Sequence, residues 1–217
     1  YVCRQTFRVG DRTISRTGFL AGLFLERLGE GQIFPHEKTM PTPREDRLQL
    51  MRACRANLSP VFTIYSDPDG DCAEFVRDVE AREPLHEFER GEDQRCALWR
   101  VQDQEWQQRL RELLEPQTVC IADGHHRYET ALSYRDEARP PSMPPGDAPE
   151  DYALALFVSV ADPGLTVLPT HRVLRADNMD HDALLEHLQS NFSLMPDPDG
   201  GTLAERWDAL REDGASI

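Results

Sequence analysis

The sequence VCIADGHHRYETAL, Val119 to Leu132, changes its hydrophobic pattern at a single glycine. Its first residues are apolar and partly β-branched, as in a buried strand, and the chain then turns at Asp123-Gly124. Beyond the turn, Tyr128, Ala131 and Leu132 recur with the spacing of one helix face. We therefore predict a buried strand that passes through a glycine turn directly into a helix, within an α+β (mixed α/β) fold.

This strand–glycine–helix junction has the chemistry of an anion site. The first N–H groups of a helix lack intrahelical partners, and the helix dipole is positive at the same end. Gly124 lets a ligand approach the backbone closely, Arg127 offers a planar fork to phosphate or carboxylate, and His126 can donate to the same anion. Asp123 can hold a divalent cation that bridges phosphate oxygens. A capped helix with exposed polar side chains is the alternative interpretation.

Zinc sites of the common kinds are not indicated. His125 and His126 lie about 100° apart on a helix, whereas helical zinc ligands are four residues apart and share one face. The five cysteines are scattered, odd in number and never spaced as CxxC, so we expect neither disulfides nor a zinc knuckle. We interpret them as reduced core residues.

A second polar cluster, Pro35-His36-Glu37-Lys38, lies in a loop that glycine and proline punctuate. A carboxylate flanked by histidine and lysine can serve as a general base whose pKa is set by those neighbours. Lys38 is also the only lysine of the chain. A solvated turn is the alternative interpretation. A third cluster, Thr170-His171-Arg172, gives a weaker indication of a site.

Charge and hydropathy narrow the classes of partner. The formal net charge of −15 at pH 7 opposes nucleic-acid binding, which needs a basic patch. No apolar run approaches the length of a membrane span and no signal peptide is visible, so we expect a cytoplasmic protein. The chain starts at Tyr1 inside a strand-like pattern and stops at Ile217 without a closing element, and we expect it to be an internal fragment.

Local patterns predict further elements on both sides of the junction. Residues around Gly10-Asp11 predict one β-hairpin, and LHEFER and QRCALWRV around Gly91 predict another. Residues 42–45 form a capping-box pattern ahead of a helix. The apolar face of that helix would consist of Leu48, Met51, Cys54 and Leu58. Further strands are expected at SPVFTIYS and YALALFVSV, with a second extended piece at TVLPTHRVL. Helices are expected at CAEFVRDVEA, at EWQQRLRELLE with Asp103 as its cap, near Asp180 and at Thr202.

A proline-rich segment divides the chain. Residues 139–151 contain five prolines in thirteen residues, which cannot sustain a helix or a central strand. We interpret this segment as a linker or a long excursion. It would separate a first domain, residues 1–138 with its N-terminal part missing, from residues 152–217, part of a second α/β segment that is incomplete at its C-terminal end.

Four motifs follow one another in a fixed order: IFPHEKT, DRLQLMRACRANLSPVFTIY, IADGHHRYETAL and LPTHRV. In this order they resemble a bacterial family catalogued as domain-of-unknown-function family 1015, over roughly residues 1–172. Because the activity of that family is unassigned, this resemblance implies membership and no function.

A more distant resemblance supplies the chemistry. The PHE loop, the DRL-type helix, the SPVF-like strand and the strand–DGHHR–helix are similar, in this order, to the ParB/sulfiredoxin fold, especially its free-serine kinases. The resemblance implies a ParB/sulfiredoxin-like nucleotide-binding core with β-hairpin insertions. Carried over by position, it makes Glu37 the general base and ATP or ADP the nucleotide. It assigns the phosphates and Mg²⁺ to Asp123, Gly124, His125, His126 and Arg127.

Two other branches of that fold match less well. Sulfiredoxins carry their catalytic cysteine two residues before the arginine, where this chain has His125, and Cys120 lies back in the strand. ParB-type nucleotide switches bind DNA through a basic helical module, which this acidic chain lacks. The kinase branch is therefore the best match in residues.

The sequence thus predicts a nucleotide-dependent phosphotransferase that acts on a small hydroxylated metabolite. Glu37 would take the hydroxyl proton, with His36 and Lys38 tuning its pKa. Two alternatives remain open. One is a nucleotide-binding regulatory module in which Glu37 does no chemistry. The other is a metal-dependent hydrolase in which His36, Glu37, Asp123 and one histidine of the 125–126 pair bind Zn²⁺ or Mn²⁺.

Overall fold

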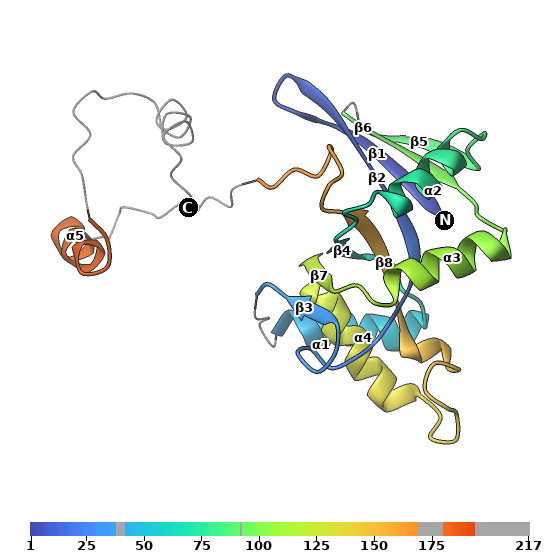
Figure 1. Ribbon diagram of the computed structural model, residues 1–217. Coiled ribbons are helices and arrows are strands. Elements are labelled where there is room, and N and C mark those ends of the chain that lie inside the picture. Colours follow the sequence, from blue (N-terminus) through green and yellow to red (C-terminus); the bar gives the residue numbers. More distant parts are fainter. Residues whose placement is uncertain (38–41, 92, 169–179, 194–217) are drawn as a thin grey trace. The chain divides into compact units, whose positions relative to one another are not determined.

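One mixed sheet of eight strands organises the computed structural model of the chain (Figure 1). The structure describes residues 1–37, 42–91, 93–168 and 180–193. The chain forms two compact units, Tyr1–Val167 and Leu168–Ile217, and the sheet belongs to the first. The order of the strands is β3-β7-β4-β8-β2-β1-β6-β5. Their bounds are β1 Val2–Val9, β2 Arg12–Phe24, β3 Ile33–Pro35, β4 Val61–Tyr65, β5 His86–Arg90, β6 Gln94–Trp99, β7 Val119–Asp123 and β8 Tyr152–Ser159.

The two predicted β-hairpins form one half of this sheet. β1 and β2 pair antiparallel from Val2–Phe19 to Val9–Arg12, and Gly10 turns the chain with a φ of 60°. β5 and β6 form the second hairpin, and β6 pairs antiparallel with β1. Both hairpin predictions are confirmed, because each depends on turn residues and alternation that lie within one short stretch.

The other half of the sheet mixes strand directions. β4 runs parallel to β8 and antiparallel to β7, and β3 runs parallel to β7. The second half of β2 pairs antiparallel with β8, from Phe19–Phe157 to Phe24–Tyr152. β8 therefore lies in the middle of the sheet. The prediction from sequence assigned these residues to the second α/β segment, residues 152–217.

The proline-rich residues 139–151 leave α4 and return to the sheet at β8. Arg139 Nε lies 2.7 Å from Asp151 Oδ1. Asp151 is buried and also accepts the backbone N–H groups of Gly146 and Ala148, at 2.9 and 3.3 Å. A short 3₁₀ turn, Pro149–Asp151, completes the segment. These contacts close the segment on itself, so it is an excursion between neighbouring elements.

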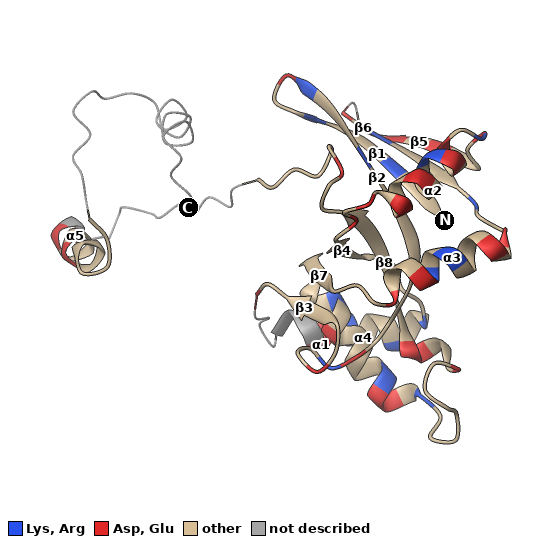
Figure 2. Ribbon diagram, in the orientation of Figure 1, with Lys and Arg blue, Asp and Glu red and all other residues tan. Residues whose placement is uncertain are grey.

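Four helices belong to the first unit, among the residues described: α1 Thr42–Cys54, α2 Asp71–Glu80, α3 Gln104–Leu114 and α4 His125–Ala138. α1 packs against α4, and α2 packs against α3. Arg52 of α1 donates from Nε and Nη2 to the two carboxylate oxygens of Glu137 on α4, at 2.9 and 2.7 Å. Acidic and basic residues are interspersed on α3 and α4, whereas α2 is mainly acidic (Figure 2).

Aromatic stacking fills the core beneath the centre of the sheet. Phe19 of β2 stacks on Phe157 of β8 with ring centroids 5.0 Å apart, and its centroid lies 5.7 Å from that of Tyr65 on β4. Val2, Ile121 and several other fully buried side chains join the same core. The buried aromatic contacts thus cross the boundary between the hairpin half and the mixed half.

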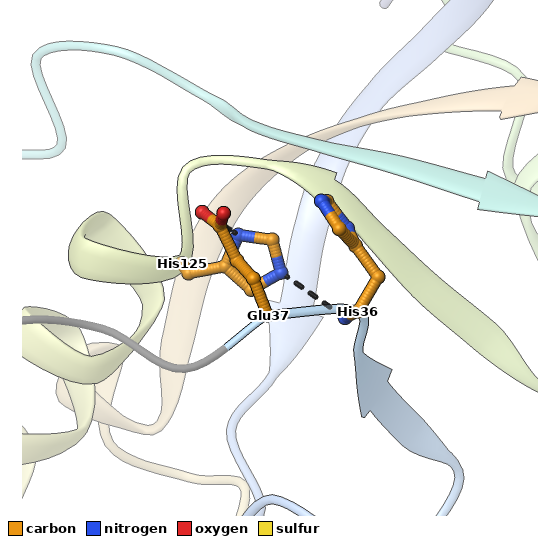
Figure 3. A group of neighbouring side chains, drawn as sticks. All are labelled: His36, Glu37 and His125. Carbon is orange, nitrogen blue, oxygen red and sulfur yellow. Dashed lines mark hydrogen bonds and ion pairs between the residues drawn. The ribbon is translucent and has the colours of Figure 1, made fainter. Parts of the chain in front are cut away.

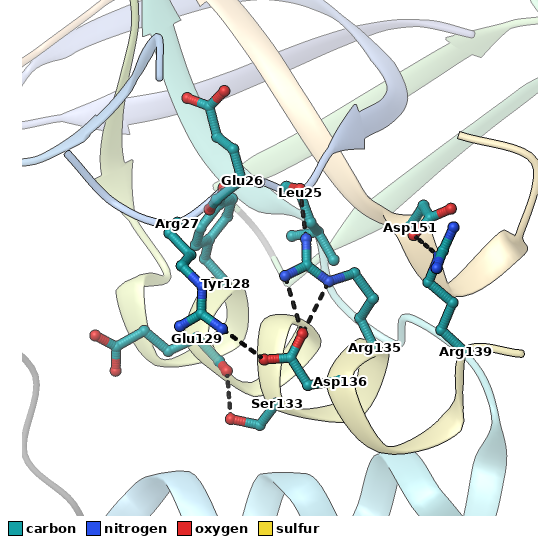
Figure 4. Close-up of polar contacts among 10 residues, drawn as sticks. All are labelled: Leu25, Glu26, Arg27, Tyr128, Glu129, Ser133, Arg135, Asp136, Arg139 and Asp151. Atoms are coloured by element: carbon teal, nitrogen blue, oxygen red, sulfur yellow. Dashed lines mark hydrogen bonds and ion pairs between the residues drawn. The ribbon is translucent and has the colours of Figure 1, made fainter. Parts of the chain in front are cut away.

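Side-chain hydrogen bonds fasten α4 to the chain that leaves β2 (Figure 4). The hydroxyl of Tyr128 donates to the carbonyl of Glu26 at 2.7 Å and accepts its backbone N–H at 3.0 Å. Burial raises the pKa of Tyr128 to about 12, so the hydroxyl keeps its proton. Arg135 donates to the carbonyl of Leu25 at 2.6 Å. The first turn of α4 is therefore held in place by a buried phenol.

The predicted helices that fall within the described residues are present, with one boundary corrected. Asp103 caps α3 by accepting the N–H groups of Glu105 and Trp106. α1 ends at Cys54, where the sequence pattern continued to Leu58, because Arg55 adopts a left-handed φ of 48°. Leu58 therefore leaves the helix face and is 65% exposed. The side chains of residues 42–44 are not among those described, so the predicted capping box stays a prediction.

In the second unit, α5 spans His181–Gln189, and Asp180 caps it as predicted, accepting the N–H groups of Asp182 and Ala183. The predicted helix at Thr202 and most of the extended piece TVLPTHRVL lie outside the described residues. The mixed α+β class is confirmed by the helices and the sheet together. Within the described residues, every helix is too short or too polar to cross a bilayer.

Candidate functional site

The predicted strand–glycine–helix junction is present at β7 and α4. Gly124 follows β7 with a φ of 92°, a left-handed conformation that glycine adopts without strain. α4 begins at His125, has no acidic residue in its first turn and receives no side-chain cap from Gly124. The N–H of Tyr128 donates to the carbonyl of Gly124 at 3.0 Å, the first contact of the helical ladder. The three preceding N–H groups thus lack that ladder, which leaves an electropositive helix start.

Parallel pairing brings the PHE loop to this junction. β3 pairs with β7 so that Pro35 lies opposite Ile121. Because parallel strands end at the same edge of a sheet, the residues after β3, His36 and Glu37, emerge beside the residues after β7. Two clusters that are far apart in the sequence therefore meet at one edge.

His125 joins the two clusters (Figure 3). Its side chain is only 2% exposed, its Nε2 accepts the backbone N–H of His36 at 3.3 Å, and its Nδ1 lies 3.3 Å from Glu37 Oε1. A backbone N–H can only donate, so Nε2 carries the lone pair and the neutral ring carries its proton on Nδ1. Burial, followed by the nearby His36, lowers the pKa of His125 and favours this neutral ring. The Nδ1–H of His125 therefore faces the carboxylate of Glu37.

His36 has the same tautomer for a similar reason. Its Nδ1 lies 2.7 Å from the carbonyl oxygen of Ile121, and a carbonyl only accepts. The proton of the neutral ring is therefore on Nδ1, and Nε2 carries a lone pair. The two imidazole rings meet edge to face, with centroids 4.5 Å apart and planes at 80°. One ring nitrogen of His36 lies within 4.8 Å of a carboxylate oxygen of Glu37.

Arg127 is fixed beside the helix start by three contacts. Its Nη2 lies 2.6 Å from Asp123 Oδ2, and its Nη1 donates to Ser59 Oγ at 3.1 Å and to the carbonyl of Pro60. Its side chain is 21% exposed, whereas that of Asp123 is 75% exposed. A Cβ on Gly124 would lie 2.7 Å from Arg127 Nε, so the guanidinium lies against the glycine. The guanidinium of Arg127 is thus held next to the start of α4, where it is paired with the carboxylate of Asp123.

The remaining predicted site residues divide into two groups. His126 is half-buried in the first turn of α4, and its carbonyl accepts the hydroxyl of Thr130 at 2.6 Å. Lys38, Thr170, His171 and Arg172 lie outside the described residues. Within the described residues, the structure brings together His36, Glu37 and His125 as one group and Asp123, Gly124 and Arg127 as another, at the start of the same helix.

One family model matches the chain over residues 1–213, and its description is "Protein of unknown function (DUF1015)". The chain belongs to this family. The membership predicted from the four ordered motifs is thereby confirmed. No curated protein and no solved structure matches the chain. The geometry of the site is thus the main guide to what this member of DUF1015 does.

Sequence reasoning missed the partners of Arg127 and a pocket beside it. Ser59 and Pro60 end the loop between α1 and β4, and no local pattern marks them as neighbours of α4. A pocket of about 70 Å³ lies between α1, this loop and α4 in the DUF1015 chain. Arg47 of α1 and Arg127 of α4 both line it. The sequence signal for this pocket was a group of apolar residues in and after α1: Leu50, Met51 and Leu58. In the structure all three are exposed or half-exposed.

The His36–Glu37–His125 group has the composition of a metal site. One ligand atom from each side chain lies within 4.8 Å of the other two. A metal at His125 Nδ1 would move the ring proton to Nε2, where it would face the N–H of His36 as donor against donor. The tautomer set by His36 N–H therefore opposes a metal held by all three residues.

Proposed function

We propose that this protein is a nucleotide-dependent phosphotransferase that acts on a small hydroxylated metabolite, on a ParB/sulfiredoxin-like core. The observation that carries the proposal is the pairing of Glu37 with the start of α4. A carboxylate suited to take a proton lies 3.3 Å from the first residue of a helix that has glycine at its N-cap and no acidic residue in its first turn. A general base and an anion site are thereby neighbours, as phosphoryl transfer to a hydroxyl requires.

Glu37 would act as the general base. The Nδ1 of His125 lies 3.3 Å from one carboxylate oxygen of Glu37, and the Glu37 side chain remains 58% exposed for a substrate. The acceptor hydroxyl loses its proton to Glu37 while its oxygen forms a bond to phosphorus. The bond from phosphorus to the leaving oxygen of the nucleotide breaks, and that oxygen keeps the bonding electrons. A ring nitrogen of His36 lies within 4.8 Å of Glu37, so His36 would be a candidate to receive the proton from Glu37.

The start of α4 would bind the phosphates. The direction of the first N–H groups and the helix dipole favour a polyanion there, and Arg127 adds a fixed positive charge. His126 follows in the same turn and is a further candidate donor. Asp123 has one carboxylate oxygen, Oδ1, outside its ion pair, and that oxygen fits Mg²⁺ shared with phosphates; the ion would neutralise charge on the transferring group.

Calorimetric titration with ATP, ADP and CTP in the presence of Mg²⁺ tests the phosphate site. The full chain should bind at least one nucleotide, and Arg127→Ala should weaken that binding at least about ten-fold, since a charge-assisted contact is lost. Arg12→Ala, an exposed arginine in the β1–β2 hairpin, serves as the control and should bind normally. Thermal unfolding of each variant establishes that it is folded.

The outcomes of this titration separate the candidate functions. Binding without turnover across a panel of hydroxylated metabolites would favour a regulatory module. If no nucleotide binds, both nucleotide-based functions are wrong.

A metal-dependent hydrolase is the second candidate, and the close approach of the ligand atoms of His36, Glu37 and His125 favours it. Zn²⁺ or Mn²⁺ would then be retained at about one equivalent by the purified protein. Elemental analysis distinguishes the two candidates, because the phosphotransferase has no place for a resident transition metal. Retained metal that Glu37→Gln releases would overturn the assignment of Glu37 as a base.

A further inference from the structure

The pocket between α1, the α1–β4 loop and α4 has no part in the mechanism above, yet it shares Arg127 with the phosphate site. We propose that this pocket binds the base of the nucleotide, so that the donor lies across Arg127 with its phosphates at the start of α4. This inference rests on the proposed phosphotransferase function and specifies where the rest of the donor is bound.

The first argument is positional. His125 and Arg127 are two residues apart on α4 and therefore point about 200° apart around the helix axis. His125 contacts Glu37, whereas Arg127 lines the pocket. Glu37 and the pocket thus flank the start of α4 from opposite sides. In phosphoryl transfer the attacking and leaving oxygens are roughly in line. If the acceptor hydroxyl lies at Glu37, the leaving part of the nucleotide therefore lies on the opposite side, toward the pocket.

The second argument is chemical. Leu50 and Leu58 are 49% and 65% exposed, so an apolar surface lies open at the pocket. Within the described residues, no ion pair joins Arg47 to an acid, and its planar guanidinium can stack on an aromatic ring. Asn57 carries both an amide donor and a carbonyl acceptor for the edge of a base. Apolar contact, a stacking cation and an amide together suit a planar heterocycle.

The third argument is size. A cavity of about 70 Å³ exceeds the space of a single water molecule, whose share of the liquid is about 30 Å³. It does not enclose a whole nucleotide. A base would therefore insert one edge between α1 and α4 and rest its face on the leucines, while the sugar and phosphates extend past Arg127.

Comparing ATP with inorganic tripolyphosphate tests the inference, because only ATP carries a base. With Mg²⁺ and the full chain, calorimetry should show that ATP binds at least about ten-fold more tightly than tripolyphosphate. The double variant Leu50→Ser/Leu58→Ser should weaken ATP binding about ten-fold, since it removes apolar surface, and should leave tripolyphosphate unchanged. Leu85→Ser is the matched control, because Leu85 is 47% exposed but lies next to β5.

The outcomes are distinct from those for the proposed function. If tripolyphosphate binds as tightly as ATP, the phosphate site stands and the base pocket is overturned. If ATP binds more tightly but the double variant behaves like Leu85→Ser, the base binds elsewhere and the inference is wrong. If neither ligand binds, the proposed function itself fails, and this inference fails with it.

Discussion

The backbone N–H of His36 points at Nε2 of His125 across 3.3 Å, and this contact fixes which nitrogen of the buried ring carries the proton. The proton is directed from Nδ1 to Glu37, so the loop after β3 and the helix after β7 are linked through one imidazole. Protonation of Nε2 would set a second N–H against that of His36, so this link between loop and helix requires the neutral ring.

Nitrogen-15 NMR of the histidine rings tests this arrangement. At neutral pH, His125 should be neutral with its proton on Nδ1, and its pKa should lie below the ordinary value of 6.5 because the ring is buried and lies near His36. Added Zn²⁺ should leave its signals unchanged. A proton on Nε2, or a zinc-induced shift of Nδ1, contradicts this tautomer and supports the metal-dependent hydrolase.

Glu37→Gln should lower turnover by about 10²–10⁴-fold, the usual contribution of a general base. Nucleotide affinity should stay within about two-fold, because Glu37 contacts the acceptor and the phosphates lie on the helix start. A kinetic assay on a metabolite identified by screening, combined with calorimetry, measures both quantities. Glu30→Gln, at an exposed position before β3, is the control. Unchanged turnover in Glu37→Gln would show that another group takes the proton.

Gly124→Ala should destabilise the fold and also displace Arg127. A left-handed φ costs alanine about 1–2 kcal/mol, and here the new Cβ would also lie 2.7 Å from Arg127 Nε. Gly10→Ala is a matched control, since Gly10 has a φ of 60° and a Cβ added there would meet no atom within 4 Å. Urea unfolding should therefore give a larger loss at position 124. Equal losses would mean that the guanidinium moves aside at no cost.

Asp151 should contribute to stability in a pH-dependent way. Its burial favours the neutral acid, but the N–H groups of Gly146 and Ala148 and the guanidinium of Arg139 outweigh burial and hold its pKa below the ordinary 3.8. The unfolded chain therefore binds the proton more readily, so this stabilisation is present above pH 3.8 and is lost as the pH falls through the folded pKa.

Asp151→Asn should accordingly lower the free energy of unfolding by about 1–3 kcal/mol at neutral pH. The gap to the unsubstituted protein should narrow in acid. Urea unfolding at several pH values measures both effects, and Asp147→Asn, exposed in the same excursion, should show neither. A gap that stays constant with pH would mean that the carboxylate is not the stabilising form.

The parts of the fold that were predictable from sequence are those decided within a short stretch. The Gly10 turn, the Asp103 cap and the Gly124 junction each depend on neighbouring residues, and all three are present. The end of α1 was misjudged because Arg55 adopts a left-handed conformation that no sequence pattern announces. Local chemistry thus predicted most elements and misplaced one boundary.

Long-range pairing was the part that local patterns could not supply. The position of β8 between β4 and β2 depends on registers that join residues far apart in the chain, such as Val61 and Ala155. Likewise, His125 meets Glu37 only because β3 runs parallel to β7. Arg127 was correctly singled out as a cation at the helix start, but its contacts with Ser59 and Pro60 could be read only from the folded chain.

The length of β2 has a consequence for how the protein opens. Its thirteen residues pair with β1 along the first part and with β8 along the second, and Phe19 takes part in both pairings. Separating β2 from β8 would break the hydrogen bonds between the two strands and expose the stacked ring of Phe19 at the same time. Separation of the two halves of the sheet is therefore expected only as part of its cooperative unfolding, whereas the short edge strand β3 lies outside this ladder and can fluctuate locally.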